Sequence, residues 1–434
     1  MLTRENWLRY HRVLALGLGF LFALLGLTGS LGVYREELDE LLNPRLVVDH
    51  PGKEYASLDR IMQAVRQAHP RREGSWTLEL PRSPRSMMTA WYEQPHETIG
   101  AFYAPLMVSV NPYTAEVVAN RFWGETAGTW LLDLHTRLGL ERWGWNAVGV
   151  LGLLLMLSVG SGLYLWWPGA DQLLRAFTVR HDAGAARLTF DLHRLVGAFC
   201  APILLLLAFT GFHLSYPEIL ESLAGSSGMS HGNDGPAIRS RAVPNNSPVG
   251  LEDAVFIARS GFPHAELRRV TTPDGDQGVY RVNFRSSSES NRKHPFTTVW
   301  VDRWAGHILG VRNPAKFSRG EDLAASIWPL HTGEAFGPLG RLLWFVAGLG
   351  LFLLYAGGLL HWLFRRGLVR DRAVDFAALG LYLRRLGASA ARNGWQSLIL
   401  TARLMKNVLH RLASLPVKET LAAWRQAAGR GDDG

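Results

Sequence analysis

Four long stretches of this 434-residue chain contain no Asp, Glu, Lys or Arg. A helix needs about 20 apolar residues to cross the hydrocarbon core of a bilayer. The pattern therefore predicts four membrane-spanning helices: Val13–Tyr34, Asn146–Trp167, Leu195–Tyr216 and Leu342–Phe364. The first follows a basic start like that of a signal peptide, but its apolar run is longer and lacks a small-residue cleavage site. We expect this span to be retained.

Basic residues near the ends of these spans predict the orientation, because Lys and Arg are retained on the cytoplasmic side. Arginines cluster before the first span, between the second and third, and after the fourth. Both termini are then cytoplasmic, and segments 35–133 and 217–330 lie outside, which in a bacterial inner membrane means the periplasm. The net charge of +9 is mostly this topology signal and gives no reason to expect nucleic-acid binding. Cys200 is the only cysteine, so the external segments contain no disulfide.

An internal repeat organises the chain. His11-Arg12, Thr28-Gly29 and Tyr34 recur without a gap as His193-Arg194, Thr210-Gly211 and Tyr216. Leu134-His135-Thr136 recurs as Leu330-His331-Thr332, and several glycines and a tryptophan follow in step: Gly144 and Gly340, Gly152 and Gly348, Gly162 and Gly358, Trp166 and Trp362. Each half thus consists of a span, an external segment and a second span.

The external segments also correspond. Leu58–Pro70 and Leu251–Pro263 have the spacing of short amphipathic helices, and residues 108–118 and 299–309 are each typical of strand, turn, strand. The predicted fold class is a helical membrane protein with four transmembrane helices in two parallel repeats and two periplasmic α+β modules. The basic tail contains an amphipathic stretch, Trp395–Leu412, which we expect either along the inner membrane surface or as a plain cytoplasmic helix.

The predicted boundaries follow directly. They are 1–34 for the cytoplasmic N-terminus and first transmembrane helix, 35–133 for the first module, 134–167 for the second helix, 168–194 for a cytoplasmic loop, 195–216 for the third helix, 217–330 for the second module, 331–364 for the fourth helix and 365–434 for the basic tail.

Six histidines lie at the ends of the predicted spans: His11, His193 and His361 on the cytoplasmic side, and His135, His213 and His331 on the periplasmic side. A single histidine there is often just an amphipathic side chain at the interface. The repeat pairs His11 with His193 and His135 with His331, whereas His213 corresponds to Leu31 and His361 to Leu165. Parallel repeats are related by an axis along the membrane normal. The pattern therefore predicts two bis-histidine sites, one near each face.

Two opposed imidazoles are the axial ligands of a bis-histidine haem. No CxxCH motif is present, so the prediction is two non-covalent b-type haems. His11, His193, His135 and His331 are the expected ligands of the haem iron, and His213 is the rival for the outer site. The repeated glycines either make room for the macrocycle or serve close helix packing. Arg12, Arg194 and Arg137 either bind haem propionates or anchor the topology.

The sequence contains no P-loop, nucleophile elbow, HExxH or dinucleotide-binding fingerprint. ATP hydrolysis, the common hydrolase and metalloprotease routes, and an internal nicotinamide or flavin site therefore lack support. Electrons would come from an unknown cytoplasmic partner or from membrane quinol. The sequence does not identify a catalytic residue.

Several motifs resemble the PepSY-associated transmembrane family: the HR and TG pairs of the first span, the LHT motifs, GLYLWWP at 162–168, FDLHRLVG at 190–197 and PLHTGEAFGPLGRLL at 329–343. The resemblance covers about Trp7–Arg366 and implies that the external modules are PepSY-like domains. The family is similar to iron-regulated inner-membrane proteins and includes periplasmic ferric-siderophore reductases that bind haem within a four-helix core. His11, His135, His193 and His331 fall on its motif positions, whereas His361 stands where the family usually has a tryptophan-rich end, and the basic tail is longer than the pattern requires.

The resemblance implies a haem-dependent reductase that passes electrons across the membrane to a periplasmic ferric siderophore, with membrane lipid as its surroundings. Two alternatives remain. One is a siderophore permease, against which stand the small number of spans and the absence of a broken-helix pattern. The other is a non-enzymatic, membrane-anchored module that binds a periplasmic partner. An absorption spectrum separates them, since only the first predicts haem bands.

Overall fold

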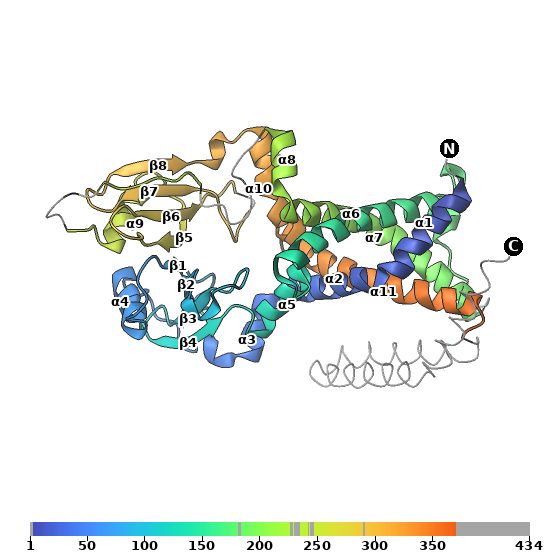
Figure 1. The fold of residues 1–434 in the computed structure, drawn as a ribbon, viewed down its shortest axis with the longest axis horizontal. Helices are drawn as coiled ribbons and strands as arrows, with labels where there is room; N and C mark the ends of the chain where they lie inside the picture. The colour runs from blue at the N-terminus through green and yellow to red at the C-terminus, as the bar shows by residue number, and fades with distance from the viewer. Residues whose placement is uncertain are drawn as a thin grey trace. The chain divides into compact units, whose positions relative to one another are not determined.

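A computed structural model describes residues 3–180, 184–225, 229, 235–241, 243, 247–289 and 291–369 of the chain (Figure 1). The chain divides into two compact units, 1–167 with 196–355, and 168–195 with 356–434. Three described helices are long and apolar enough to cross a membrane: α6 (Glu141–Trp166), α7 (Ala185–Ser215) and α11 (Gly337–Arg365). The amphipathic stretch Trp395–Leu412 and most of the basic tail lie outside the described residues.

The first predicted span is broken rather than continuous. It consists of α1 (Arg4–Gly17) and α2 (Gly19–Gly32), which meet at a 62° bend, and the pair is long enough for a fourth crossing only if both helices are counted together. Gly17 and Gly19 flank the break, and glycine is a weak helix former. A Cβ at Gly19 would clash with the ring of Tyr355, so only glycine fits at the bend. The expectation that no span has a broken-helix pattern was therefore wrong.

The two LHT motifs lie on short helices that precede the long ones. His135 belongs to α5 (Ala127–Arg137) and His331 to α10 (Arg319–Thr332), and each helix starts with a capping box, at Thr126 and Ser318. Each ends within three residues of its histidine, where Leu138 and Gly333 adopt the left-handed conformation. The helices α6 and α11 then begin after a sharp turn.

The two segments that were predicted to be external form one continuous antiparallel sheet of eight strands, in the order β4-β3-β2-β1-β5-β6-β7-β8. The first half supplies β1 (Thr77–Glu79), β2 (Met88–Tyr92), β3 (Leu106–Val110) and β4 (Val117–Phe122), and the second supplies β5 (Glu266–Thr271), β6 (Val279–Arg285), β7 (Thr298–Asp302) and β8 (Ile308–Arg312). The two predicted strand-turn-strand segments are confirmed as β3–β4 and β7–β8. The halves join where β1 pairs with β5, and the hydroxyls of Thr77 and Thr271 are 2.9 Å apart across that seam.

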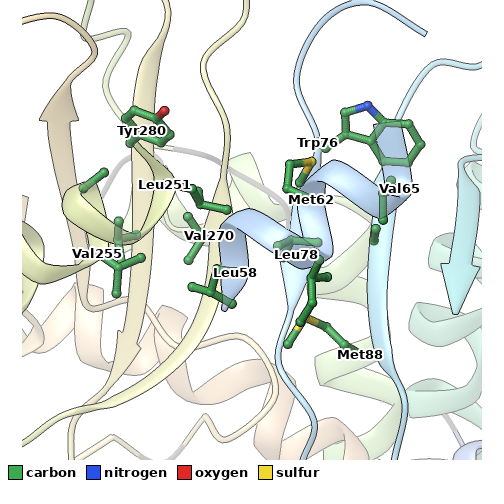
Figure 2. Close-up of a cluster of buried hydrophobic side chains, with 14 of the residues drawn as sticks. Leu58, Met62, Val65, Trp76, Leu78, Met88, Leu251, Val255, Val270 and Tyr280 are labelled. Atoms are coloured by element: carbon green, nitrogen blue, oxygen red, sulfur yellow. The ribbon is translucent and has the colours of Figure 1, made fainter. Parts of the chain in front are cut away.

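Both predicted amphipathic helices are confirmed, as α4 (Leu58–Ala68) and α9 (Leu251–Arg259). Their apolar faces and the strands of both halves share a single hydrophobic core, and Figure 2 shows side chains such as Leu58 and Leu251 entering it from the two helices. The Asp59 carboxylate of α4 accepts hydrogen bonds from the Leu251 and Glu252 amides and so caps α9 from the other half. The two α+β modules are therefore two halves of one folded body.

Within the first unit, α2, α6, α7 and α11 pack around a smaller apolar core of Phe22, Leu151, Leu204 and Leu351. Two short helices continue the chain beyond α2 and α7, namely α3 (Arg35–Leu42) and α8 (Pro217–Ala224). The helix α8 lies against α10, and α3 against α5. The second unit contains the start of α7 and the end of α11.

Candidate cofactor-binding site

Two of the predicted ligands face each other in the first unit. The ring centres of His135 on α5 and His331 on α10 are 6.2 Å apart, and the ring planes are inclined by 42°. In a bis-histidine centre, two imidazoles bind one metal ion from opposite sides, and each coordinating nitrogen lies about 2 Å from the metal. The centres of the two rings are then roughly 6 Å apart. The outer pair therefore has the spacing that a bis-histidine metal centre requires.

Hydrogen bonds fix the tautomer of both rings. His331 Nδ1 lies 2.8 Å from the hydroxyl of Thr210, which donates its own proton to the Leu206 carbonyl and so must accept from the ring. His135 Nδ1–H donates to the Leu25 carbonyl at 3.0 Å and lies 3.3 Å from the Thr28 hydroxyl. A neutral imidazole protonated at Nδ1 has its free lone pair on Nε2. Neither Nε2 has a hydrogen-bond partner among the described residues, which leaves both available as ligands.

A glycine backs each ring. A Cβ at Gly29 of α2 would lie 2.7 Å from His135 Cε1, and one at Gly211 of α7 would lie 3.3 Å from His331 Cε1. The Thr-Gly pair of each half thus supplies the Nδ1 partner and the space for the imidazole. Gly29 and Gly211 therefore make room for the two rings of this pair. Gly144 and Gly340 lie against the backbone of the preceding turns, and Gly152 and Gly348 against neighbouring helices.

The inner histidines are held in the same way, each within its own unit. His11 Nδ1–H donates to the Ser158 carbonyl of α6 at 3.1 Å and lies 3.0 Å from the Ser161 hydroxyl. A Cβ at Gly162 would approach His11 Cε1 to 3.1 Å. In the second unit, a Cβ at Gly358 of α11 would lie 3.2 Å from His193 Cε1. The pairing of His11 with His193 stays a prediction, because the two residues belong to different units.

The other two span-end histidines occupy different surroundings. His213 is 4% exposed, its Nδ1 has no hydrogen-bond partner in the described part of the chain, and it lines a small cavity with Asn291, Phe296 and Trp328. No described contact joins it to His135 or His331. His361 lies in the second unit and donates from Nδ1 to the Ala186 carbonyl.

The three arginines considered for haem propionates have other contacts or are exposed. Arg137 is buried and pairs with Asp133 and Glu141. Arg194 donates to the Thr178 carbonyl and lies 3.4 Å from Asp191. Arg12 is exposed at the surface of α1. Arg137 therefore ties the end of α5 to the start of α6. Of the three arginines, only Arg12 is without a contact of this kind in the described structure.

An ion network links the sheet to the outer histidine pair. Lys293 Nζ, from the connection between β6 and β7, lies 3.1 Å from Glu36 Oε1 and 3.2 Å from Glu334 Oε1. Glu334 follows His331 by three residues, and Glu36 lies in the first turn of α3, just after the helix that carries Gly29. Arg82 joins Glu36 to Glu79 on β1. The network therefore connects both halves of the sheet with the segments that position the two rings.

The charge of Glu36 should make this network sensitive to acid. Burial raises the pKa of the Glu36 carboxyl, but Lys293, Arg82 and Arg35 lower it more, so that the pKa falls from 4.5 to about 2. A pKa lowered by folding stabilises the protein above the unfolded value and loses that contribution as the pH falls from about 4.5 towards 2. We expect Glu36→Gln to lower the thermal unfolding temperature at pH 7 and to lower it much less near pH 2.5, as measured on protein in detergent. An equal effect at both pH values would contradict this.

The histidines of the sheet domain do not gather into a larger group of potential metal ligands in the part of the chain that the structure describes. No group there brings together three or more His, Cys, Asp or Glu side chains at metal-binding distance. His69 Nε2 lies 2.9 Å from Asn120 Oδ1, and the His294 ring packs edge-on against Trp328. These contacts are structural.

Sequence reasoning did not assign four residues that hold the rings. Thr28 and Thr210 are the Nδ1 partners, and Gly162 and Gly358 are the inner glycine contacts. All four recur between the halves, so the repeat itself contained the signal. What it could not supply was the pairing of each residue with a particular histidine.

Fold and site together define a helical membrane protein with an antiparallel sheet domain and a facing pair of histidines beside its helical core. The family model described as the PepSY-associated TM region matches residues 8–365. The chain therefore belongs to the PepSY-associated transmembrane family. No curated protein matches the chain.

Proposed function

We propose that the protein is a dihaem b-type oxidoreductase of the bacterial inner membrane, which passes electrons across the membrane and reduces a ferric siderophore in the periplasm. The observation that supports this most directly is the His135–His331 pair, whose ring centres are 6.2 Å apart with both Nδ1 atoms occupied. In this proposal the protein has four spans, both termini in the cytoplasm and the eight-stranded sheet in the periplasm.

Bound haem would supply a one-electron carrier at each histidine pair. His135 and His331 would hold the outer one through their Nε2 atoms, and His11 and His193 the inner one. The Nδ1–H groups donate to Leu25 and Thr210, which keeps each Nε2 unprotonated and fixes the orientation of each ring. Such a hydrogen bond also raises the basicity of Nε2 as a ligand. Two sites are needed because a bilayer core of about 30 Å is too wide for one tunnelling step.

The substrate chemistry is a one-electron reduction of chelated Fe(III) to Fe(II). Siderophores hold Fe(II) weakly, so reduction releases the metal without breaking the chelator. The sheet and its ion network would stand on the side where the chelate arrives. The proposal does not specify which siderophore is reduced.

The direct test is the haem content of the purified protein. We expect a pyridine haemochrome assay to give two non-covalent haems b per chain after expression with sufficient haem, and a reduced spectrum with sharp α and β bands. Absence of haem under these conditions would reject the proposal. A spectrum with one haem would restrict it to a single histidine pair.

The break between α1 and α2 is the one observation that favours a siderophore permease, since broken helices line the binding sites of many transporters. Against this, the break is filled by the Tyr355 ring at Gly19. The same absorption spectrum decides between the two, because a permease has no reason to contain haem. A partner-binding module without haem would fail the same test.

A further inference from the structure

His361 presents a free hydrogen-bond acceptor at one end of α11. Its Nδ1–H donates to the Ala186 carbonyl of α7 at 2.9 Å, which leaves the lone pair of the ring on Nε2. Within the described residues, Nε2 has no hydrogen-bond partner. The ring is partly buried on a helix that otherwise carries no charge from Leu342 to Phe364. A ligand that approaches from the lipid could donate a hydrogen bond to this Nε2.

An aromatic and cationic cluster surrounds this acceptor. The ring of Phe190 lies 5.3 Å from the His361 ring, centre to centre, and is 39% exposed. The guanidinium groups of Arg187 and Arg194 lie over Phe190 at 5.5 and 5.9 Å. The buried Asp191 carboxylate accepts a hydrogen bond from Arg187 and lies 3.4 Å from Arg194, so both arginines are held in place. The cluster combines an exposed aromatic face with a polar acceptor, which suits a planar ring with a hydroxyl group.

The acceptor lies close to a predicted haem ligand of the same unit. The His193 ring packs on Gly358 of α11, and His361 follows Gly358 by three residues. Residues three apart on a helix are neighbours on one face. A ring bound at His361 would therefore lie about one helical turn, roughly 5 Å, from the position that His193 contacts.

We propose that His361 and Phe190 bind a membrane quinol, the electron donor of the reaction. This rests on the proposed function. The quinol hydroxyl donates a hydrogen bond to His361 Nε2, and its ring packs against Phe190. Oxidation of one quinol to the quinone releases two protons and two electrons. His361 Nε2 takes the proton of the hydroxyl that it contacts, the proton of the opposite hydroxyl passes to water, and the two electrons reduce two ferric chelates, one each.

The repeat favours a donor site over a third haem site. His361 corresponds to Leu165, so no symmetry-related histidine opposes it, and one face of its ring is already covered by Phe190. The counterpart also offers a natural test. His361→Leu installs the residue that the other half of the chain uses at this position.

The test uses the full chain in detergent, with the quinol analogue 2-heptyl-4-hydroxyquinoline N-oxide as the probe. We expect His361→Leu to weaken its binding by up to about ten-fold by titration calorimetry, as the loss of one hydrogen bond predicts. The rate of haem reduction by decylubiquinol should fall by a similar factor, while haem content and reduction by dithionite stay unchanged. Phe190→Leu should weaken binding several-fold. His264→Leu, at an exposed histidine of the sheet domain, is the control and should change nothing.

Two results would overturn the inference. If His361→Leu loses haem, the residue is an axial ligand. If probe binding and quinol-driven reduction are both unchanged, the donor binds elsewhere, for example as a soluble protein at the exposed arginines. Failure of the proposed function gives a different result, because the wild-type protein would then contain no haem. Binding of the probe is measured by calorimetry and does not depend on haem.

Discussion

Replacing His331 with Ala is expected to remove the haem of the His135–His331 pair and to abolish reduction of an external ferric chelate. The opposed ring supplies the second axial nitrogen, and His135 alone leaves the iron with one protein ligand. His135→Ala should give the same result. The haem of the inner pair should remain, because its expected ligands lie on other segments. Haem per chain, measured by pyridine haemochrome, should fall by half.

The matched control is His213→Ala. This residue is also at a span end and is only 4% exposed, yet it lines a cavity with Asn291 and Trp328 instead of facing the pair. It should keep both haems and the chelate reductase activity. If His213→Ala loses the outer haem while His331→Ala keeps it, the symmetry argument is wrong. The periplasmic iron would then lie between the second and third spans.

The inner histidines give the complementary result. His11→Ala or His193→Ala should leave an outer haem that dithionite reduces but the physiological donor does not. Redox titration of each variant would identify which band belongs to which site. These variants also test the His11–His193 pairing, which the two separate units do not establish.

The sequence predicted the histidine pairing for a physical reason. Two copies of one segment must fold alike, so His135 and His331 had to occupy equivalent positions, and a symmetry axis brings equivalent positions face to face. The same reasoning could not show that each histidine ends a short helix of its own. Each short helix ends because Leu138 or Gly333 adopts the left-handed conformation. A leucine in the sequence does not indicate such a helix end.

The joining of the modules was also beyond the sequence pattern. The strand β1 has three residues, Thr77–Glu79, and its pairing with β5 depends on contacts between residues about 190 positions apart. The periodicity of each half indicated an α+β module. It did not indicate that the edge strands β1 and β5 of the two modules would pair with each other. The break at Leu18 was missed because a charge-free run of apolar residues looks the same whether straight or bent. Only the ring of Tyr355, from the other half, distinguishes Gly19 from an ordinary glycine.

The two glycines behind the outer rings give a matched pair of variants. Gly29→Ala places a methyl group 2.7 Å from His135 Cε1, which is closer than packed carbon atoms come, so the ring must move. Gly211→Ala places it 3.3 Å from His331 Cε1, which a shift of a few tenths of an ångström relieves. We expect Gly29→Ala to weaken haem binding at the outer site roughly ten- to hundred-fold, as overpacking by about 1–3 kcal/mol implies. Gly211→Ala should stay near the wild type, as judged by haem retention and the α band.

Helix propensity separates this effect from a general change in stability. Both glycines lie inside helices, α2 and α7, where alanine is favoured by up to about 1 kcal/mol over glycine. Both variants gain that contribution equally, so any difference between them comes from the contact with the imidazole. The clash itself can be tested without haem: adding Gly29→Ala to His135→Ala should not lower the thermal unfolding temperature below that of His135→Ala alone, because the methyl group then meets no ring. Equal haem loss in the two single variants would show that the glycines serve helix packing instead of the position of the imidazoles.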